Sequence, residues 1–303
     1  MSASRSAATA FFIDASIAGR GCSISGDDIA CRVPLGGEGY SGVVKGPTSV
    51  LAANLRGDAR VRVAAAGDIH CAPETRDAVL TAFDAIEGTA DVVLLAGDLT
   101  THGEPEQAEI LAEACRGMET PVVAVLGNHD LHANRAGELT GVLTDAGIQL
   151  LERSHTTLKG CGVGIAGTKG FVGGFRGLGL PDFGEPSLRG IYAETTAEVE
   201  ALSAGLHEIA LCPFRVALLH YAPVQETLQG EPPEIWTFLG SDRLAAPILE
   251  HRPDLVLHGH AHAGRLQADL DGVPVYNVSV PVMGQDFWIF ELSGVSQAAS
   301  AVH

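Results

Sequence analysis

The sequence predicts an α/β fold with a parallel sheet in its first ordered half. Three short apolar runs of strand length alternate with segments whose apolar residues recur at helical spacing. Each run ends at a glycine followed by Asp or Asn, residues that favour a tight turn. Strands and helices that alternate in this way form parallel βαβ units with right-handed crossovers.

These three units occupy residues 60–146. We predict the strands at residues 61–66, 91–96 and 122–126, and the helices at residues 74–86, 105–115 and 134–146. In the first helix, Val79, Leu80, Phe83 and Ile86 recur at helical spacing, as expected for a helix that covers a sheet. Pro105 lies in the first turn of the second helix, where a missing N–H is tolerated.

The second half of the chain predicts further strands, several of them antiparallel. We expect a hairpin at 156–166, a long loop at 167–186, a helix at 188–211, and strands at 215–219, 255–257, 266–270, 273–278 and 287–290. Asp271-Gly272 separates two of these runs, and an Asp-Gly pair is typical of a two-residue hairpin turn.

Residues 1–58 have a different composition, rich in Gly, Ser and Ala, without a sustained period of 2 or 3.6 residues. We predict a poorly ordered N-terminal extension that could hold a short strand, followed by one catalytic domain at residues 59–295. Asp14 interrupts the first apolar run, and no signal-peptide cleavage site follows it, so we expect no secretory signal.

Composition excludes several classes of protein. Of the 303 residues, 46% are hydrophobic and 18% are charged, which indicates a globular chain. No apolar stretch approaches the ~20 residues of a membrane helix, so we expect no membrane partner. The six cysteines form no CxxC pair, which favours reduced thiols in a cytoplasmic protein.

The chain is strongly acidic. It has 19 Lys and Arg against 37 Asp and Glu, so the formal charge is 19 − 37 = −18. Such a surface repels nucleic-acid backbones, which argues against a nuclease. An anionic substrate must therefore meet a local positive centre, and bound metal could supply it.

Five short polar blocks carry the candidate chemistry. They are Asp68-Ile69-His70, Gly97-Asp98, Gly127-Asn128-His129-Asp130, His220 and Gly259-His260-Ala261-His262. Each follows an apolar run, at the point where a strand should end. Because ligand sites of open α/β sheets form beyond the carboxyl ends of strands, we expect the blocks to meet in one crevice. Any single block could instead be a helix cap or a hydrogen-bonded core histidine.

The residue types in these blocks suit a pair of metal ions. Two aspartates, one asparagine and four histidines offer carboxylate, amide and imidazole ligands, a mixture that suits Mn, Fe, Zn or Ni better than Mg or Ca. Seven ligands are too many for one tetrahedral ion, but they fit two ions that share a carboxylate. Two ions at roughly 3.5–4 Å are the usual means of hydrolysing phosphate esters.

The ordered set of blocks resembles the calcineurin-like metallophosphoesterase superfamily over residues 61–290. The resemblance implies a four-layer α/β/β/α sandwich, in which two mixed β-sheets are flanked by helices. It also implies two divalent or mixed-valence metal ions, with Mn and Fe expected first and Zn or Ni as alternatives.

The resemblance also implies a role for each ligand. Asp68, His70 and His262 would hold the first metal. Asn128, His220 and His260 would hold the second, and Asp98 would bridge the two. A hydroxide between the metals would attack phosphorus in line.

Two further residues are candidates by the same resemblance, and a third, His102, is a candidate because it lies four residues after Asp98. His129 would face the leaving group as an acid or a charge stabiliser, and Asp130 would orient His129 through a ring nitrogen. Asn128, His129 and His102 are the candidate substrate contacts. We also expect His132 near the entrance and His258 behind the ligands.

The residues after Asp98 separate subfamilies. Protein phosphatases of this superfamily resemble Gly-Asp-x-x-Asp-Arg-Gly and later Gly-Asn-His-Glu, whereas this chain has Thr101-His102 and Asp130 at those positions. The missing arginine favours a phosphodiesterase that acts on a small organic phosphate or nucleotide. A phosphomonoesterase and a non-catalytic scaffold are the alternatives.

Two loops are candidates for substrate contact. Residues 169–176 carry Lys169 and Arg176, and residues 231–238 carry Trp236, whose ring could stack on a base. Ordinary loop packing is the alternative for both.

Overall fold

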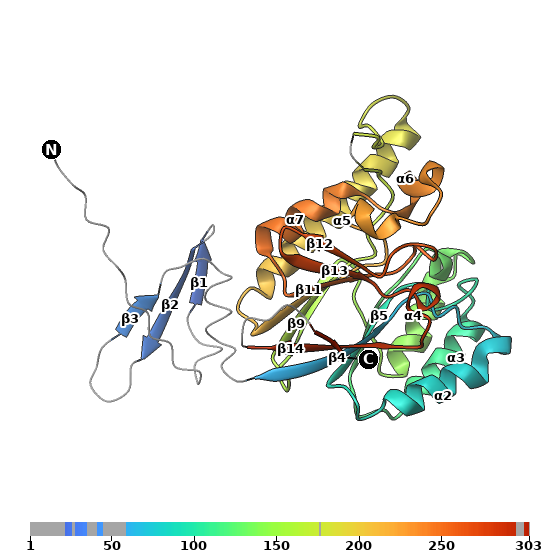
Figure 1. Cartoon of the computed structure of the whole chain (residues 1–303), viewed down its shortest axis with the longest axis horizontal. Coiled ribbons are helices and arrows are strands. Elements are labelled where there is room, and N and C mark those ends of the chain that lie inside the picture. Colours follow the sequence, from blue (N-terminus) through green and yellow to red (C-terminus); the bar gives the residue numbers. More distant parts are fainter. Residues whose placement is uncertain are drawn as a thin grey trace.

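The computed structural model describes residues 59–175 and 177–294 in full. It also describes the backbone of four strands outside these ranges: β1 (Cys22–Ser25), β2 (Asp28–Pro34), β3 (Ser41–Val44) and β15 (Ser300–Val302). The main body has four layers, in which two six-stranded sheets face each other between outer helices (Figure 1). This is the predicted α/β/β/α sandwich.

The first sheet has the strand order β15-β14-β4-β5-β6-β7. Its parallel part consists of β4 (Arg60–Ala66), β5 (Val92–Ala96), β6 (Val122–Val125) and β7 (Gln149–Leu150). The strand β14 (Trp288–Ser293) runs antiparallel to β4 and to β15. The sheet is therefore mixed, as predicted.

The second sheet has the order β12-β13-β11-β10-β9-β8. Its four central strands are parallel: β13 (Val273–Asn277), β11 (Leu255–His258), β10 (Phe214–Leu218) and β9 (Val163–Gly167). The edge strands β12 (Gln267–Leu270) and β8 (Ser154–Leu158) are antiparallel to their neighbours. Asp271 and Gly272 both have positive φ in the β12–β13 turn, which confirms the predicted hairpin.

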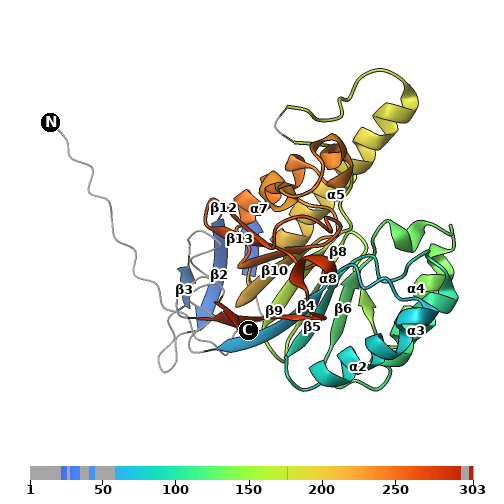
Figure 2. The same ribbon diagram turned by 45° about the vertical axis from the view of Figure 1, so that its right-hand side comes forward.

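Helices cover the outer face of each sheet (Figure 2). The first sheet is covered by α2 (Arg76–Ile86), α3 (Pro105–Cys115) and α4 (Ala136–Asp145), and the second by α5 (Pro186–Glu208) and α7 (Ala245–His251). Two one-turn helices, α6 (Trp236–Leu239) and α8 (Val280–Met283), lie in connecting loops. Among the described residues, no helix combines the length and apolar character needed to cross a membrane.

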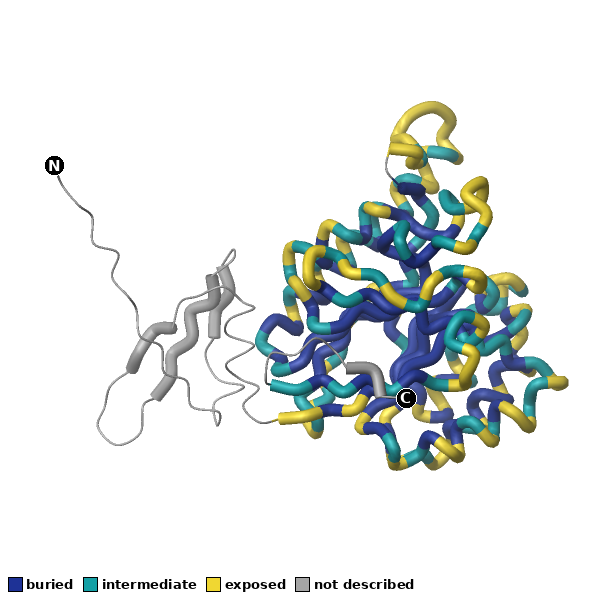
Figure 3. Tube along the Cα trace, in the orientation of Figure 1, coloured by how far each residue is buried: buried dark blue, intermediate teal, exposed yellow. Residues whose placement is uncertain are grey.

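The two-residue period of a strand divides the core into layers. In β4, Val61, Val63 and Ala65 point between the sheets, whereas Ala64 and Ala66 point toward the helices. Buried residues accordingly concentrate in the strands (Figure 3). Burial on both faces explains why these strands are continuous apolar runs in the sequence.

Every strand and helix that we predicted between residues 61 and 290 is present, with ends that differ by a few residues. The elements that we missed are short: β7, β15 and the helices α6, α7 and α8. Most of the predicted extension at 1–58 lies outside the described residues. Within it, β1, β2 and β3 form an antiparallel sheet where we expected at most one strand. The boundary at residue 58 stays a prediction.

Candidate metal centre

The five polar blocks lie at one edge of the sandwich, beyond the carboxyl ends of strands from both sheets. Asp68 and His70 follow β4, and Asp98 follows β5. Backbone hydrogen bonds join these turns: the Asp68 N–H donates to the Gly97 carbonyl, and the Gly259 N–H donates to the His220 carbonyl. The predicted convergence in one crevice is therefore what the fold produces.

The ligand atoms form two groups. Asp68, His70, Asp98 and His262 each bring a ligand atom within 4.8 Å of the others, and Asp98, His220 and His260 do the same. Asp98 belongs to both groups. Its carboxylate oxygens can therefore serve both halves of the centre, which is the geometry of a bridging ligand.

Asn128 completes the second group. Its Oδ1 lies 3.0 Å from the Nε2 of His220. An amide oxygen is an uncharged ligand that can coordinate a metal cation. The second group can thus offer Asn128, His220 and His260 together with the shared Asp98.

Four of the predicted ligands have a left-handed backbone. The φ angles of Asp68, His70, Asp98 and His260 are 57°, 49°, 49° and 71°. This region is sparsely populated by residues with a side chain, and such residues concentrate at functional sites. The conformation turns each side chain back toward the crevice directly after its strand.

The glycines before Asp98 and Asn128 allow the close approach of the blocks. A Cβ at Gly97 would lie 2.5 Å from the Nδ1 of His220, and a Cβ at Gly127 would lie 2.1 Å from the Oδ1 of Asp98. Both distances are too short for any side chain. The Gly-Asp and Gly-Asn pairs are therefore needed for packing as well as for turning.

Backbone carbonyls fix the orientation of two histidines. The Nδ1 of His220 donates to the Ala96 carbonyl at 2.9 Å, and the Nε2 of His260 donates to the Phe238 carbonyl at 3.1 Å. In each ring the other nitrogen is left as the acceptor that a metal needs. The sequence cannot identify these supporting carbonyls, because every residue has a backbone carbonyl.

Burial and neighbouring charges give His220, His260 and Asp68 the protonation states that metal binding requires. In the chain without metal, burial raises the pKa of Asp98, and the hydrogen bond to Asp68 raises the pKa of His262. Burial lowers the pKa of both His220 and His260 to about 4, so both rings are neutral at pH 7. Burial alone would raise the pKa of Asp68, but the hydrogen bond from His262 and neighbouring imidazoles lower it to about 2. Neutral imidazole and ionised carboxylate are the forms that coordinate metal.

His70 supplies an independent test of whether a cation fits. Its Nε2 is buried and has no hydrogen-bond partner among the described residues, and the nearest carboxylate oxygen, Oδ2 of Asp98, is 3.9 Å away. Buried polar atoms are nearly always satisfied, so an orphaned nitrogen between two carboxylates calls for a ligand. A metal ion in the first group would satisfy it, and the residues therefore fit the metal pair.

A sequence model described as "Calcineurin-like phosphoesterase" matches residues 61–264, which is more than half of the chain and includes all seven ligands. The chain belongs to the calcineurin-like phosphoesterase family. No curated protein matches its sequence.

Solved structures share the fold of this family member at low sequence identity. TT1561 of Thermus thermophilus is 19% identical, with a TM-score of 0.52, and the match covers 80% of this chain and 98% of that one. Phosphopantetheinyl hydrolase (PptH) from Mycobacterium tuberculosis is 16% identical, with a TM-score of 0.53, and the match covers 74% and 91%. These likenesses establish the architecture alone.

His129 lies beside the candidate ligands, and its expected role at the leaving group stays a prediction. Its ring is 4.7 Å from that of His70 between centroids, and its Nδ1 donates to the Thr101 carbonyl at 2.7 Å. The half-buried ring is therefore held in one tautomer, with Nε2 free to exchange a proton.

The expected role of Asp130 is wrong. Its carboxylate does not touch the ring of His129. It accepts hydrogen bonds from the backbone N–H groups of Leu99, Thr100 and Gly127 and from the Thr100 hydroxyl, at 2.7–3.1 Å. Asp130 is fully buried, and burial raises its pKa to about 6 against these hydrogen bonds. It fastens the loop after β5 to the loop after β6, so it supports Asp98 and Asn128.

The three histidines that we expected around the ligands, His102, His132 and His258, belong to neither ligand group. The exposed rings of His102 and His132 lie 6.1 Å apart between centroids, so the substrate contact of His102 stays a prediction. His258 is buried behind the ligands, and its Nε2 lies 2.9 Å from the Thr227 hydroxyl.

Trp236 donates to the Glu231 carbonyl and packs against a small apolar cluster, which favours a packing role. Arg176 lies outside the described residues.

One neighbour of the centre escaped the sequence analysis. The ring of Tyr221 is 4.5 Å from that of His260 between centroids. It is buried, and it follows His220 directly in the chain. Its position directly after His220 in the sequence was the signal that could have identified it.

Proposed function

We propose that this chain is a metal-dependent phosphodiesterase that hydrolyses small organic phosphate esters, including nucleotides. The observation that carries the proposal is the position of Asp98 in two adjacent ligand groups with His129 beside them. Manganese or iron is the metal that we expect first, with zinc or nickel as alternatives.

The metal pair, when bound, would acidify a water molecule and neutralise the phosphoryl oxygens. The chain's own part is to hold and orient. The backbone N–H of His129 donates to Oδ1 of Asp98 at 2.8 Å, so the shared ligand is hydrogen-bonded to the residue that carries the candidate acid. With Nδ1–H engaged by the Thr101 carbonyl, the doubly protonated ring of His129 can donate the proton on Nε2 to the departing alkoxide, which leaves the neutral ring with its proton on Nδ1.

One feature favours a diester over a monoester. The position at which the family's protein phosphatases carry an arginine is held here by His102, which is exposed. A monoester dianion needs one more cationic contact than a diester monoanion does, and a guanidinium supplies it in bidentate form. A phosphomonoesterase is the nearest alternative. A non-catalytic scaffold is opposed by the retention of all seven ligands.

We also propose a cytoplasmic location, where thiols stay reduced. Among the described residues, Cys71, Cys115, Cys161 and Cys212 are unpaired, which accords with it.

The experiment is a metal-dependence assay. The purified protein is stripped with chelator, reloaded with Mn²⁺, Fe²⁺, Zn²⁺ or Ni²⁺, and assayed on bis-p-nitrophenyl phosphate and p-nitrophenyl phosphate. We expect hydrolysis that needs metal and has a higher kcat/KM for the diester. Preference for the monoester would establish the alternative, and a protein that binds no metal would establish the scaffold. Rapid cleavage of plasmid DNA at moderate salt would instead identify a nuclease.

A further inference from the structure

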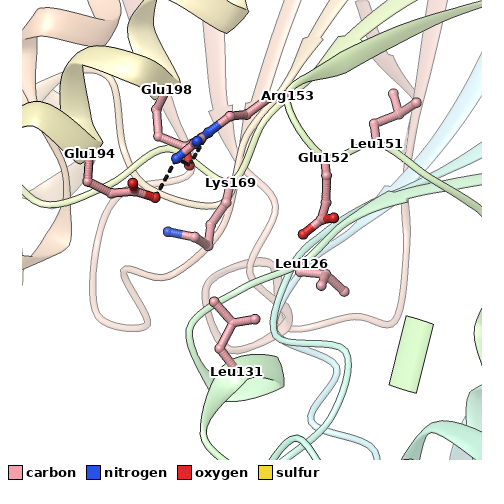
Figure 4. Close-up of a pocket in the computed structure, with 8 residues that line it drawn as sticks. All are labelled: Leu126, Leu131, Leu151, Glu152, Arg153, Lys169, Glu194 and Glu198. Carbon is pink, nitrogen blue, oxygen red and sulfur yellow. Dashed lines mark hydrogen bonds and ion pairs between the residues drawn. The ribbon is translucent and has the colours of Figure 1, made fainter. Parts of the chain in front are cut away.

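A pocket adjoins the second half of the metal centre. It has a volume of about 400 Å³ and is lined by Leu126, Leu131, Leu151, Glu152, Arg153, Lys169, Glu194 and Glu198 (Figure 4). The N–H of Leu131 donates to the Asn128 carbonyl at 3.2 Å, and the N–H of His220 donates to the Lys169 carbonyl at 3.0 Å. Asn128 and His220, two candidate ligands of the second group, are therefore hydrogen-bonded through their backbones to residues of the pocket wall. Its size falls within the roughly 300–1,000 Å³ of small-molecule sites.

Part of the pocket wall is a fixed ionic network. The Arg153 guanidinium pairs with Glu194 and, at 3.0 Å, with Glu198. Glu198 is 2% exposed and also accepts hydrogen bonds from the Thr168 hydroxyl and from the Gly170 N–H. The network ties α5 to the segment on either side of Lys169. Its charged groups are already partnered, so they shape the pocket and leave recognition to other residues.

Lys169 and Glu152, two charged side chains of the wall, form no short-range ion pair in the described part of the chain, although the carboxylates of Glu198, Glu194 and Glu152 act on Lys169 from a longer distance. The Nζ of Lys169 donates to the Gly170 carbonyl at 2.9 Å and lies 4.3 Å from the centre of the Phe171 ring. In the part of the chain that the structure describes, no carboxylate is within ion-pair distance of Lys169, and the carboxylate of Glu152 makes no hydrogen bond or ion pair. The two residues stand on either side of the pocket (Figure 4).

The backbone supports a recognition role for this segment. Arg153 has a φ of 46°, a left-handed conformation that residues with side chains rarely adopt. Its guanidinium contacts hold the turn in this state. Glu152, directly before it, is therefore presented to the pocket by a strained and anchored turn, a combination typical of binding segments.

We propose that this pocket binds one of the two alcohol groups of the phosphodiester, and that it is built for a neutral polyhydroxy group such as a sugar or polyol. The Glu152 carboxylate accepts hydrogen bonds from hydroxyls, and the Lys169 ammonium donates to them. Leu126, Leu131 and Leu151 pack against the C–H faces of the same group. The inference rests on the proposed phosphodiesterase function and adds its substrate class.

Charge argues against the other classes of ligand. The wall carries three carboxylates against two cations, so an anionic substituent meets repulsion from Glu152. A cationic substituent meets the ammonium of Lys169. A purely apolar substituent would strip water from both charged groups without replacing their hydrogen bonds, which is unfavourable.

The test uses diesters of p-nitrophenyl phosphate that release the same chromophore. The second alcohol is methanol as the reference, then glucose, choline or lactate as the neutral polyol, cation and anion. We expect the glucose ester to exceed the methyl ester in kcat/KM by about tenfold, the effect of one or two well-placed hydrogen bonds. Glu152→Gln and Lys169→Met should each remove most of this preference. The preference is measured as the ratio of kcat/KM for the glucose ester to that for the methyl ester, so a general loss of activity in a variant cancels. The metal content should stay within about twofold of wild type.

Matched controls are Glu119→Gln and Lys159→Met, which remove the same charges from exposed positions outside the pocket. They should keep the glucose preference. A preference that survives both pocket variants, or that is absent from the wild type, overturns the proposal. A preference for choline or for lactate overturns it in favour of a cationic or an anionic substituent.

Failure of the proposed function has a different outcome. If no diester is hydrolysed with any metal, the proposed phosphodiesterase function is refuted. The pocket can then still be tested by ligand binding. Calorimetry on the metal-loaded protein should then show tighter binding of glucose 1-phosphate than of methyl phosphate. Glu152→Gln should abolish the difference, and equal affinities in the wild type overturn the inference.

Discussion

Asp98 and His129 are joined by a hydrogen bond of 2.8 Å, in which the backbone N–H of His129 donates to Oδ1 of Asp98. This bond connects the carboxylate shared by both ligand groups to the residue that we place at the leaving group. The two residues come from loops after neighbouring parallel strands, β5 and β6. Their separate roles can be tested by separate substitutions.

Asp98→Ala should remove metal from both groups, because its carboxylate belongs to each of them. We expect affinity for both ions to fall by roughly 100-fold or more, beyond the effect of losing an outer partner of a ligand. Elemental analysis after dialysis measures the loss. Asp145→Ala, at an exposed position in α4, is the control. Retention of one tightly bound ion would contradict a bridging role for Asp98.

His129→Ala should retain both metals but lose turnover. Its ring is not in either ligand group, and removal of a general acid typically lowers kcat by about 10²–10⁴-fold. The loss should be smaller for esters with a good leaving group, such as p-nitrophenol, than for alkyl esters, because protonation matters less there. His132→Ala, at an exposed position, should keep normal activity. An equal loss on both kinds of ester would remove the acid role.

Asp130→Ala should act through stability. The substitution leaves buried N–H groups of Leu99, Thr100 and Gly127 without their acceptor. We expect the free energy of unfolding of the metal-free protein to fall by about 3 kcal/mol, because a buried N–H left without an acceptor costs about 1–3 kcal/mol. Urea denaturation measures it. Unchanged stability with lost activity would point back to a direct role at His129.

The strand ends, and the candidate ligands that the fold brings together, could be chosen from the sequence because both depend on local pattern. Apolar runs that end in Gly-Asp or Gly-Asn identify buried strands and the turn that follows them, and the order of the blocks identified the family. Asp130 shows where this reasoning stops. Its neighbour His129 was the nearest partner along the chain, yet its carboxylate accepts hydrogen bonds from Gly127, three positions away, and from Leu99 and Thr100, 31 and 30 positions away. The supporting carbonyls of Ala96, Thr101 and Phe238 were equally unpredictable, since any residue can supply a carbonyl.

Acid should destabilise the metal-free protein through His258. Burial lowers the pKa of this histidine to about 4 in the folded chain, against 6.5 for an ordinary histidine. Between these two values the unfolded chain binds more protons, so stability is lost as the pH falls through that window. At pH 4 this histidine lowers the free energy of unfolding by about 3 kcal/mol.

His258→Gln isolates this effect, because glutamine can hydrogen-bond to Thr227 but does not titrate. The difference in unfolding free energy between wild type and variant should therefore shift by about 3 kcal/mol in favour of the variant from pH 7 to pH 4. Asp130, whose pKa is raised to about 6, titrates in the opposite sense, but it is common to both proteins and cancels. His155→Gln, at an exposed site, should show no such shift.

Gly127→Ala should weaken metal binding although no ligand is changed. The added Cβ would lie 2.1 Å from the Oδ1 of Asp98, so the shared carboxylate or the β6 loop must move. We expect metal affinity to fall at least about tenfold, the lower range for disturbed ligand support. Gly137→Ala is the matched control, because a Cβ there meets nothing within 4 Å and lies in α4. That substitution should raise stability by up to about 1 kcal/mol, since alanine favours the helix more than glycine does. Unaltered metal affinity in Gly127→Ala would mean that Asp98 is free to shift, and its proposed position between the two groups would not be needed for binding.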